Sequence, residues 1–301
     1  MGKIILKSNY DKQNLFTNLY ETTQPKAIVQ IVHGMKEHQL RYAPFAEFLN
    51  ANGFTVITSD LRGHGPNATL LGYMEGKKPW EALVEDQVTI TQYLKNRFPN
   101  TDIYLFAHSM GTIISRNLIQ QHATDYKKIV LSGVPGYQAA ASFGILMANL
   151  IGCFKSNTHV SNFLEKQTLG AFEKSVKNAK TPADWVSVSE TNIQNYLNDP
   201  YCNIPFTVSA YKALYHLVKE MHKSSRYVVH EPTKPILMLV GALDPCPLGD
   251  KGLNGSIATL KKAGYTNVTF KKYENMRHEI LNEENHTLVY EDILNFFLAE
   301  A

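Results

Sequence analysis

Short runs of apolar and β-branched residues alternate with longer stretches of helical periodicity along most of this 301-residue chain. Runs of this length fit strands that are buried on both faces, which is typical of a parallel sheet. Strands that alternate with helices predict an α/β fold with a mostly parallel central sheet of about eight strands, flanked by helices. We expect buried strands at 27–32, 55–59, 103–107, 129–131, 236–241 and 268–273, an antiparallel edge at 4–7 and 15–20, and helices at 42–52, 79–98, 110–122, 252–263 and 283–298.

The alternation stops between residues 134 and 232, where helix-like stretches and prolines occur without a strand–helix–strand unit. Loops in compact domains rarely exceed about 15 residues, so this segment is too long to be a plain connection. We expect a mainly helical lid that is inserted into the core. The predicted organisation is a core in two parts, residues 1–133 and 233–301, with the lid at 134–232 between them.

Composition and short motifs exclude several classes of function. The chain is 44% hydrophobic and 19% charged, which is enough apolar material for a large core. Its net charge of +3 is spread without a basic block, so a nucleic-acid partner is not expected. The sequence has no GxGxxG, HExxH or CxxC motif, and we expect its cysteines, Cys153, Cys202 and Cys246, to be reduced thiols. We therefore predict neither a cofactor nor a metal.

Two apolar stretches bear on where the protein resides. The run at residues 4–6 is far shorter than the ~7–15 residues of a secretory signal, which favours a cytoplasmic protein. Residues 129–154 carry no charge and are long enough for a membrane helix. Glycine, proline and polar residues interrupt this second run, so a buried strand, a turn and an apolar helix fit it better.

The expected strand at 103–107 runs directly into a turn centred on Ser109 that begins a helix. A serine at a sharp strand-to-helix turn projects its hydroxyl above the sheet edge, as in the G-x-S-x-G nucleophile elbow. Such a turn needs small residues two positions before and after the serine, and Ala107 and Gly111 satisfy this. Ser109 is therefore the candidate nucleophile, although a serine that only caps a helix gives the same local pattern.

A nucleophilic serine needs a general base and a carboxylate that orients the base. In a parallel sheet both are expected in loops at the carboxyl ends of strands, because ligands bind at that edge. Asp244 and His278 each follow one of the last two expected strands. The chain order Ser109, Asp244, His278 therefore predicts a catalytic triad, with Asp250 and His286 as competing candidates for the acid and the base.

Backbone N–H groups beside the nucleophile are expected to bind the oxyanion of the tetrahedral intermediate. The two candidates are the N–H of Met110, after the serine, and that of Met35, in a loop that follows the strand at 27–32. We expect a substrate pocket next to them, with apolar lid residues along an acyl channel. Its candidate residues are His38, Phe143, Leu146, Trp185, Tyr201 and Phe206.

Five sequence blocks carry a resemblance to a known family: residues 33–38 with 41–42, then 60–65, 108–111, 243–245 and 277–279. On these blocks the chain resembles the α/β-hydrolases, and more narrowly the bacterial lysophospholipase and monoacylglycerol lipase group of serine hydrolases (serine aminopeptidase S33-type). The resemblance implies a triad of Ser109, Asp244 and His278, with Met35 and Met110 as oxyanion donors. It also implies hydrolysis of carboxylic esters through an acyl-enzyme, by a lysophospholipase, a monoacylglycerol lipase or a carboxylesterase.

Two rival functions remain compatible with this reading. An aminopeptidase, similar to proline iminopeptidases, needs lid carboxylates for the substrate's α-ammonium group, and Glu165, Asp184, Glu190 and Asp199 are candidates. A non-catalytic binding protein is the other rival, but such proteins normally lack a member of the triad. For the ester hydrolase we expect a small ester or monoacyl lipid as substrate, and transient contact of the uncharged lid stretch 145–151 with a membrane surface. Acyl-chain preference and oligomeric state stay open.

Overall fold

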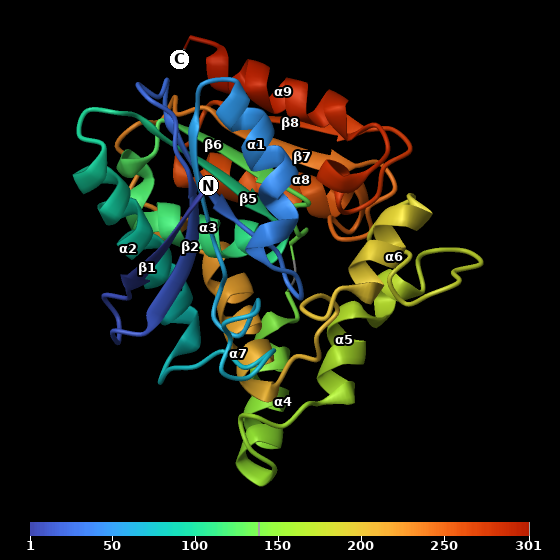
Figure 1. The fold of residues 1–301 in the computed structure, drawn as a ribbon. Helices are drawn as coiled ribbons and strands as arrows, with labels where there is room; N and C mark the ends of the chain where they lie inside the picture. Colours follow the sequence, from blue (N-terminus) through green and yellow to red (C-terminus); the bar gives the residue numbers. More distant parts are fainter. Residues whose placement is uncertain (138, 301) are drawn as a thin grey trace.

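The computed structural model describes residues 1–137 and 139–300, which form an eight-stranded sheet covered by helices (Figure 1). The strands lie in the order β1-β2-β4-β3-β5-β6-β7-β8. This confirms the predicted α/β class, and each strand falls close to its expected position. The strands are β1 (Gly2–Lys7), β2 (Asn14–Tyr20), β3 (Ile28–Val32), β4 (Thr55–Ser59), β5 (Ile103–His108), β6 (Lys128–Ser132), β7 (Ile236–Gly241) and β8 (Val268–Tyr273).

Strands β3 to β8 are parallel to one another, whereas β2 pairs antiparallel with both β1 and β4. The register brings the carboxyl ends of the parallel strands together. Val32 of β3 lies opposite Ser59 of β4 and Ala107 of β5, and the last residue of β7 pairs with the last of β8. The loops that carry the candidate site residues therefore emerge along one edge of the sheet.

Side chains that alternate along each strand divide the core into two layers. In β3, Val29 and Ile31 pack in the layer of helices α1 and α9, whereas Ile28 and Val32 pack in the layer of α2, α3 and α8. Strands β3 to β6 are buried on both faces, which is why they read as largely apolar runs. The helices of the core are α1 (Ala43–Ala51), α2 (Pro79–Arg97), α3 (Met110–His122), α8 (Gly249–Ala263) and α9 (His286–Leu298).

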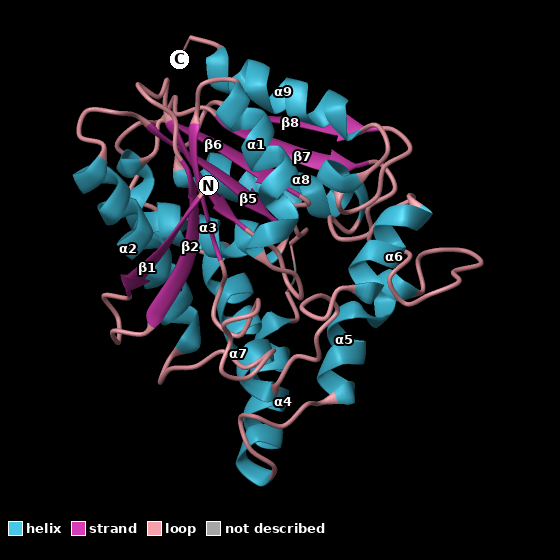
Figure 2. Ribbon diagram, in the orientation of Figure 1, coloured by secondary structure: helices cyan, strands magenta, loops and turns pink. Residues whose placement is uncertain are grey.

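Between β6 and β7 the chain forms helices without adding a strand to the sheet (Figure 2). We call this segment, residues 134–232, the insertion. Helix α7 packs against α2 and α3 of the core, and α4 packs on α7 and extends away from the sheet in Figure 1. The helices of the insertion are α4 (Ala141–Phe154), α5 (Asn162–Glu173), α6 (Glu190–Asn198) and α7 (Val208–Met221).

The uncharged run at 129–154 becomes strand β6, a connection and helix α4, as its interruptions predict. Across residues 1–137 and 139–300, no helix combines the length and hydropathy required to cross a bilayer.

Candidate active site

Ser109 occupies a strained turn between β5 and α3. Its backbone angles are φ 50° and ψ −119°, a left-handed φ that non-glycine residues rarely adopt. Strain of this kind costs on the order of 1–3 kcal/mol and persists where the surrounding fold enforces it. Here α3 lies very close to β3. A Cβ on Gly111 would lie 2.2 Å from the carbonyl oxygen of Val32, so only glycine allows this approach. The elbow expected from the sequence is thus formed.

The side chains of Ser109, His278 and Asp244 form a continuous hydrogen-bonded line. His278 Nε2 lies 2.8 Å from Ser109 Oγ, and His278 Nδ1 lies 2.9 Å from Asp244 Oδ2. The carboxylate of Asp244 is itself oriented, because its Oδ1 accepts the backbone N–H of Cys246 at 2.8 Å. With the carboxylate accepting from Nδ1–H, the imidazole is left with Nε2 as the acceptor for the serine hydroxyl proton.

Burial and charge act on His278 in opposite directions. Its burial disfavours the imidazolium, but the carboxylate of Asp244, with help from Glu279, outweighs this and raises the pKa of His278. A base with a raised pKa accepts a proton more readily, which suits a group that must deprotonate a hydroxyl.

The two competing candidates are engaged elsewhere. Asp250 forms an ion pair with Lys272. His286 stands at the beginning of α9, where its Nδ1 bonds to the backbone oxygen of Glu283. Neither lies in the hydrogen-bonded line of Ser109.

Met35 and Met110 line the same cavity as Ser109. In the described residues neither N–H donates a hydrogen bond to a protein acceptor; Met110 is the first residue of α3, where helical geometry supplies no acceptor. Buried N–H groups are nearly always paired, so two free ones beside a nucleophile mark a place for an acceptor oxygen. Gly34 permits this arrangement, since a Cβ there would lie 3.0 Å from the Cβ of Ser109.

His33 supports the loop at residues 33–38, which we call the oxyanion loop because it carries the candidate donor Met35. Its Nδ1 lies 2.7 Å from the carbonyl oxygen of Gly34, and its Nε2 accepts the backbone N–H of Leu61 at 2.9 Å. Complete burial keeps the pKa of His33 well below its usual value, so the ring is neutral. This is a structural histidine.

Sequence reasoning missed a buried charge cluster behind the base. Arg41 bonds through Nη2 to Glu279 at 2.7 Å and through Nη1 to Glu37 at 3.2 Å. Although burial opposes it, Arg41 lowers the pKa of Glu279 to about 2. Glu37 also accepts the N–H of Gly34 at 2.6 Å. The cluster therefore ties the oxyanion loop to the residue that follows the base; the only signal for it in the sequence was that both acids lie within the motif blocks.

An apolar cavity of about 120 Å³ opens at Ser109. Of the described residues that line it, none is acidic or basic. An uncharged wall of this kind accepts a hydrocarbon chain and excludes charged groups. Helices of the insertion supply most of the wall, through Ala141, Phe143, Gly144, Met147, Phe163, Leu164, Gln167, Thr168, Leu169, Phe172, Leu214, Tyr215 and Val218.

A second, polar cavity of about 40 Å³ also reaches Ser109, and its wall includes His278. It is lined in part by charged side chains, which the apolar cavity lacks. Trp185 borders both cavities and stacks obliquely on the ring of His278, with centroids 4.9 Å apart. The polar lining includes Lys36, Glu37, Glu165, Glu173, Tyr196, Asn203 and Glu279.

Of the six expected pocket residues, Phe143 and Trp185 line the apolar cavity. The other four lie outside both cavities at Ser109, for reasons that depend on tertiary packing. Leu146 is exposed on the outer side of α4, and Phe206 is fully buried beneath Lys36. Tyr201 packs edge-on against His38, with ring centroids 5.8 Å apart.

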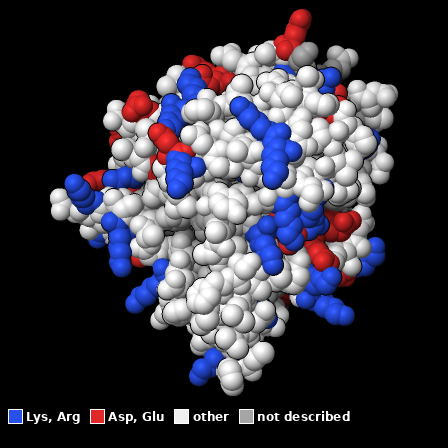
Figure 3. All heavy atoms as spheres, turned by 180° about the vertical axis from the view of Figure 1, so that it is seen from behind, with Lys and Arg blue, Asp and Glu red and all other residues white. Residues whose placement is uncertain are grey.

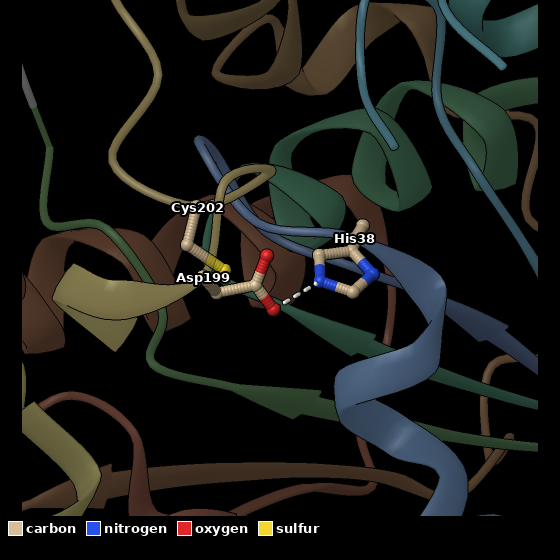
Figure 4. A group of neighbouring side chains, drawn as sticks. All are labelled: His38, Asp199 and Cys202. Atoms are coloured by element: carbon tan, nitrogen blue, oxygen red, sulfur yellow. Dashed lines mark hydrogen bonds and ion pairs between the residues drawn. The ribbon is translucent and has the colours of Figure 1, made fainter. Parts of the chain in front are cut away.

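His38, Asp199 and Cys202 form a compact group outside the cavities (Figure 4). Asp199 Oδ2 lies 2.8 Å from His38 Nε2, which links the oxyanion loop to the insertion. Burial raises the pKa of the Cys202 thiol, which lies beside this pair. The backbone N–H of Cys202 also donates to the carbonyl oxygen of Asp199, at 3.0 Å.

Comparison with known proteins agrees with the fold. The family model described as serine aminopeptidase, S33, matches residues 23–285, and the chain belongs to this family of α/β-hydrolases. The chain is 25% identical to a monoacylglycerol lipase from Mycolicibacterium smegmatis, across 92% of this chain and 90% of that protein. It is 25% identical to the human monoglyceride lipase, across 92% and 83% of the two chains.

Among solved structures, a thermostable carboxyl esterase from Bacillus coagulans in complex with glycerol superimposes with a TM-score of 0.89. That comparison covers 98% of this chain and 97% of the esterase, at 25% sequence identity.

Proposed function

We propose that this chain is a carboxylic ester hydrolase whose substrates combine one acyl chain with a small polar alcohol, as in a monoacylglycerol. The observation that carries the proposal is the pair of unlike cavities that meet at Ser109: one uncharged, the other polar. An ester placed across the serine puts its acyl chain in the first cavity and its leaving alcohol in the second. The names of the related lipases and esterases support the same reaction.

The reaction is acyl transfer to water. Ser109 Oγ attacks the ester carbonyl carbon while His278 Nε2 accepts the hydroxyl proton and Asp244 stabilises the imidazolium. The N–H groups of Met35 and Met110 bind the oxyanion, and such donors are worth roughly 3 kcal/mol each in the transition state. His278 then gives its proton to the leaving alcohol. Water, deprotonated by the same imidazole, finally releases the acid from Ser109.

The small size of the polar cavity, about 40 Å³, bears on the leaving group. It suits a compact alcohol with hydroxyl groups better than a bulky head group. This favours a monoacylglycerol or simple ester over a lysophospholipid as the preferred substrate class.

The aminopeptidase reading has weaker support from the same residues. Of the four expected ammonium acceptors, Glu190 and Asp199 are paired with Lys180 and His38, and both lie outside the two cavities at Ser109. Asp184 lies outside them too, where it caps the turn at residues 180–181. Glu165 lines the polar cavity but is paired with Lys36.

One carboxylate keeps the aminopeptidase reading testable. Glu173 lines the polar cavity and makes no ion pair or hydrogen bond to the other described residues. Hydrolysis of p-nitrophenyl esters from acetate to palmitate, beside an aminoacyl naphthylamide, separates the two functions. Turnover of esters alone supports the proposal, and preferential cleavage of the naphthylamide refutes it.

The apolar cavity predicts which variant changes chain-length preference. Met147 lines the cavity, so Met147→Trp fills part of its about 120 Å³. We expect the KM for p-nitrophenyl laurate to rise about 10-fold or more. The contact of one methylene group with a hydrophobic pocket is worth about 1–3 kcal/mol, and the new side chain displaces at least one of them. The acetate ester, which does not reach this wall, is expected to be hydrolysed as before.

Leu146→Trp is the matched control, because Leu146 is the neighbouring residue on α4 and faces away from the cavity. Equal effects of the two substitutions on the laurate ester would show that the acyl chain lies elsewhere.

We also propose that the insertion acts as a lid that touches lipid surfaces through α4. Phe143, Leu146, Leu150 and Phe154 are all exposed on this helix, and Phe154 is 84% exposed. Seen from behind, the lower end of the molecule, where Figure 1 places α4, is mostly white in Figure 3, with one blue side chain at its edge. An apolar helix face of this kind binds the boundary between head groups and acyl chains.

Phe154→Glu is expected to weaken binding to phosphatidylcholine vesicles about 10-fold, since it removes one large apolar side chain from the contact. Vesicle flotation measures this. Leu288→Glu is the control, because Leu288 is also an exposed apolar residue but lies on α9. If the wild-type protein does not float with the vesicles, the proposed membrane contact is wrong. The proposal of ester hydrolysis does not depend on this result.

A further inference from the structure

The loop that carries Met35 is held by the insertion rather than by the core alone. Lys36, the next residue, has a left-handed φ of 58°. Its carbonyl oxygen accepts the backbone N–H of Asn203, in the insertion, at 2.9 Å. On the core side its own N–H donates to His64 Nε2 at 3.3 Å. The orientation of the peptide after Met35 therefore depends on contacts from both parts of the chain.

The side chain of Lys36 makes the strongest of these contacts. It is 4% exposed, and its ammonium group forms an ion pair with Glu165 of helix α5. The second carboxylate oxygen of Glu165 accepts the hydroxyl of Tyr211, from α7, at 2.6 Å. A buried ammonium group without its carboxylate is strongly disfavoured, so loss of this partner moves the lysine out of its place.

A strained backbone conformation persists only where its surroundings enforce it. At Lys36 the enforcing contacts are the ion pair with Glu165 and the hydrogen bond from Asn203. If the lysine side chain leaves, its backbone can relax out of the left-handed region. The peptide unit that joins Met35 to Lys36 then reorients, and the backbone of Met35, with its N–H, shifts with it.

We propose that Glu165 is a positioning residue: through its ion pair with Lys36 it keeps the N–H of Met35 directed at the oxyanion. Glu165 thus acts on catalysis from the insertion, through another residue. This inference rests on the proposed function, because it assigns to Met35 the role of an oxyanion donor.

Glu165→Gln tests the inference with little change in shape. We expect kcat for p-nitrophenyl acetate to fall about 10- to 100-fold, approaching the effect of losing one oxyanion donor, while KM changes less than about 3-fold. This ester has no long acyl chain, so a change in the apolar cavity does not affect it. Glu190→Gln is the matched control, since it breaks the exposed Lys180–Glu190 ion pair of the same insertion and should leave kcat unchanged.

The outcomes separate this role from a structural one. A fall in kcat with KM and melting temperature nearly constant supports positioning. An unchanged kcat overturns it, and so does a rise in KM alone, which would mean that Glu165 contacts substrate. Should Glu165→Gln fail to fold, Tyr211→Phe removes only the hydroxyl on Glu165 and must lower kcat as well, by a smaller factor, or the inference fails.

A fluorophosphonate probe distinguishes failure of this inference from failure of the proposed function. The probe phosphonylates an activated serine whatever the natural substrate, and its transition state also places charge on an oxygen. Wild-type labelling without ester turnover refutes the ester hydrolase alone. The labelling rate constant of Glu165→Gln, compared with wild type, then still decides the role of Glu165: a rate more than about 10-fold lower supports it, and an equal rate overturns it.

Discussion

Ser109→Ala is expected to lower kcat/KM for p-nitrophenyl esters by at least about 10⁴-fold, because it removes the proposed nucleophile. Folding should be unaffected or slightly improved. The alanine keeps the backbone φ of 50° at this turn. It has no hydroxyl group that must be held beside the imidazole of His278. Initial rates check the first expectation, provided that the enzyme concentration is far above that of any contaminating esterase. The melting temperature checks the second.

Ser115→Ala is the matched control for this experiment. Ser115 lies on the same helix, is fully buried, and its hydroxyl has no hydrogen-bond partner in the described part of the chain. Its removal should leave turnover at the wild-type level. Retention of more than about a hundredth of the activity in Ser109→Ala would mean that another residue is the nucleophile.

The central strands could be predicted from the sequence because both of their faces are buried. Strands such as β3 and β5 are buried at every position, which gives a largely apolar run that is easy to recognise, although β3 contains Gln30 and β5 ends in His108. That the candidate triad residues lie together could be predicted for a related reason. Strand order fixes which loops share an edge, so an acid after β7 and a histidine after β8 had to lie near each other.

The pocket was harder to predict because it depends on how helices of the insertion rotate against one another. Met147 and Leu146 are neighbours in the sequence and both apolar, yet Met147 lines the cavity and Leu146 faces outward. Phe206 is as apolar as Phe143, but it lies fully buried beneath Lys36. Periodicity says that a helix has an apolar face, not which neighbour covers it.

The contacts of Glu165 and Glu279 could not be predicted for a different reason. Each is a long-range ion pair: Glu165 with Lys36, and Glu279 with Arg41. Local sequence pattern carries no information about a partner more than a hundred residues away. Both contacts converge on the loop that carries Met35, so the least predictable part of the site is the support of the oxyanion loop.

Asp244→Asn is expected to change both the rate and its pH dependence. Loss of the carboxylate removes the group that orients Nδ1–H and stabilises the imidazolium, and comparable substitutions in serine hydrolases lower kcat about 10⁴-fold. The base must be neutral to act, so activity falls as pH drops through the pKa of His278. Because Asp244 raises that pKa, its loss lowers the pKa and moves the acid limb of the kcat/KM profile to lower pH.

Asp250→Asn serves as the control, since Asp250 is the next acidic residue after Asp244 along the chain. Its side chain is exposed and forms an ion pair with Lys272. It should leave both the rate and the acid limb unchanged. A pH–rate profile of the two variants beside wild type makes the comparison. A 10⁴-fold loss in Asp250→Asn with a nearly normal Asp244→Asn would assign the acid to Asp250. A slow Asp244→Asn whose acid limb does not move would show that the carboxylate orients the ring without setting its pKa, because the two roles of Asp244 act on different observables.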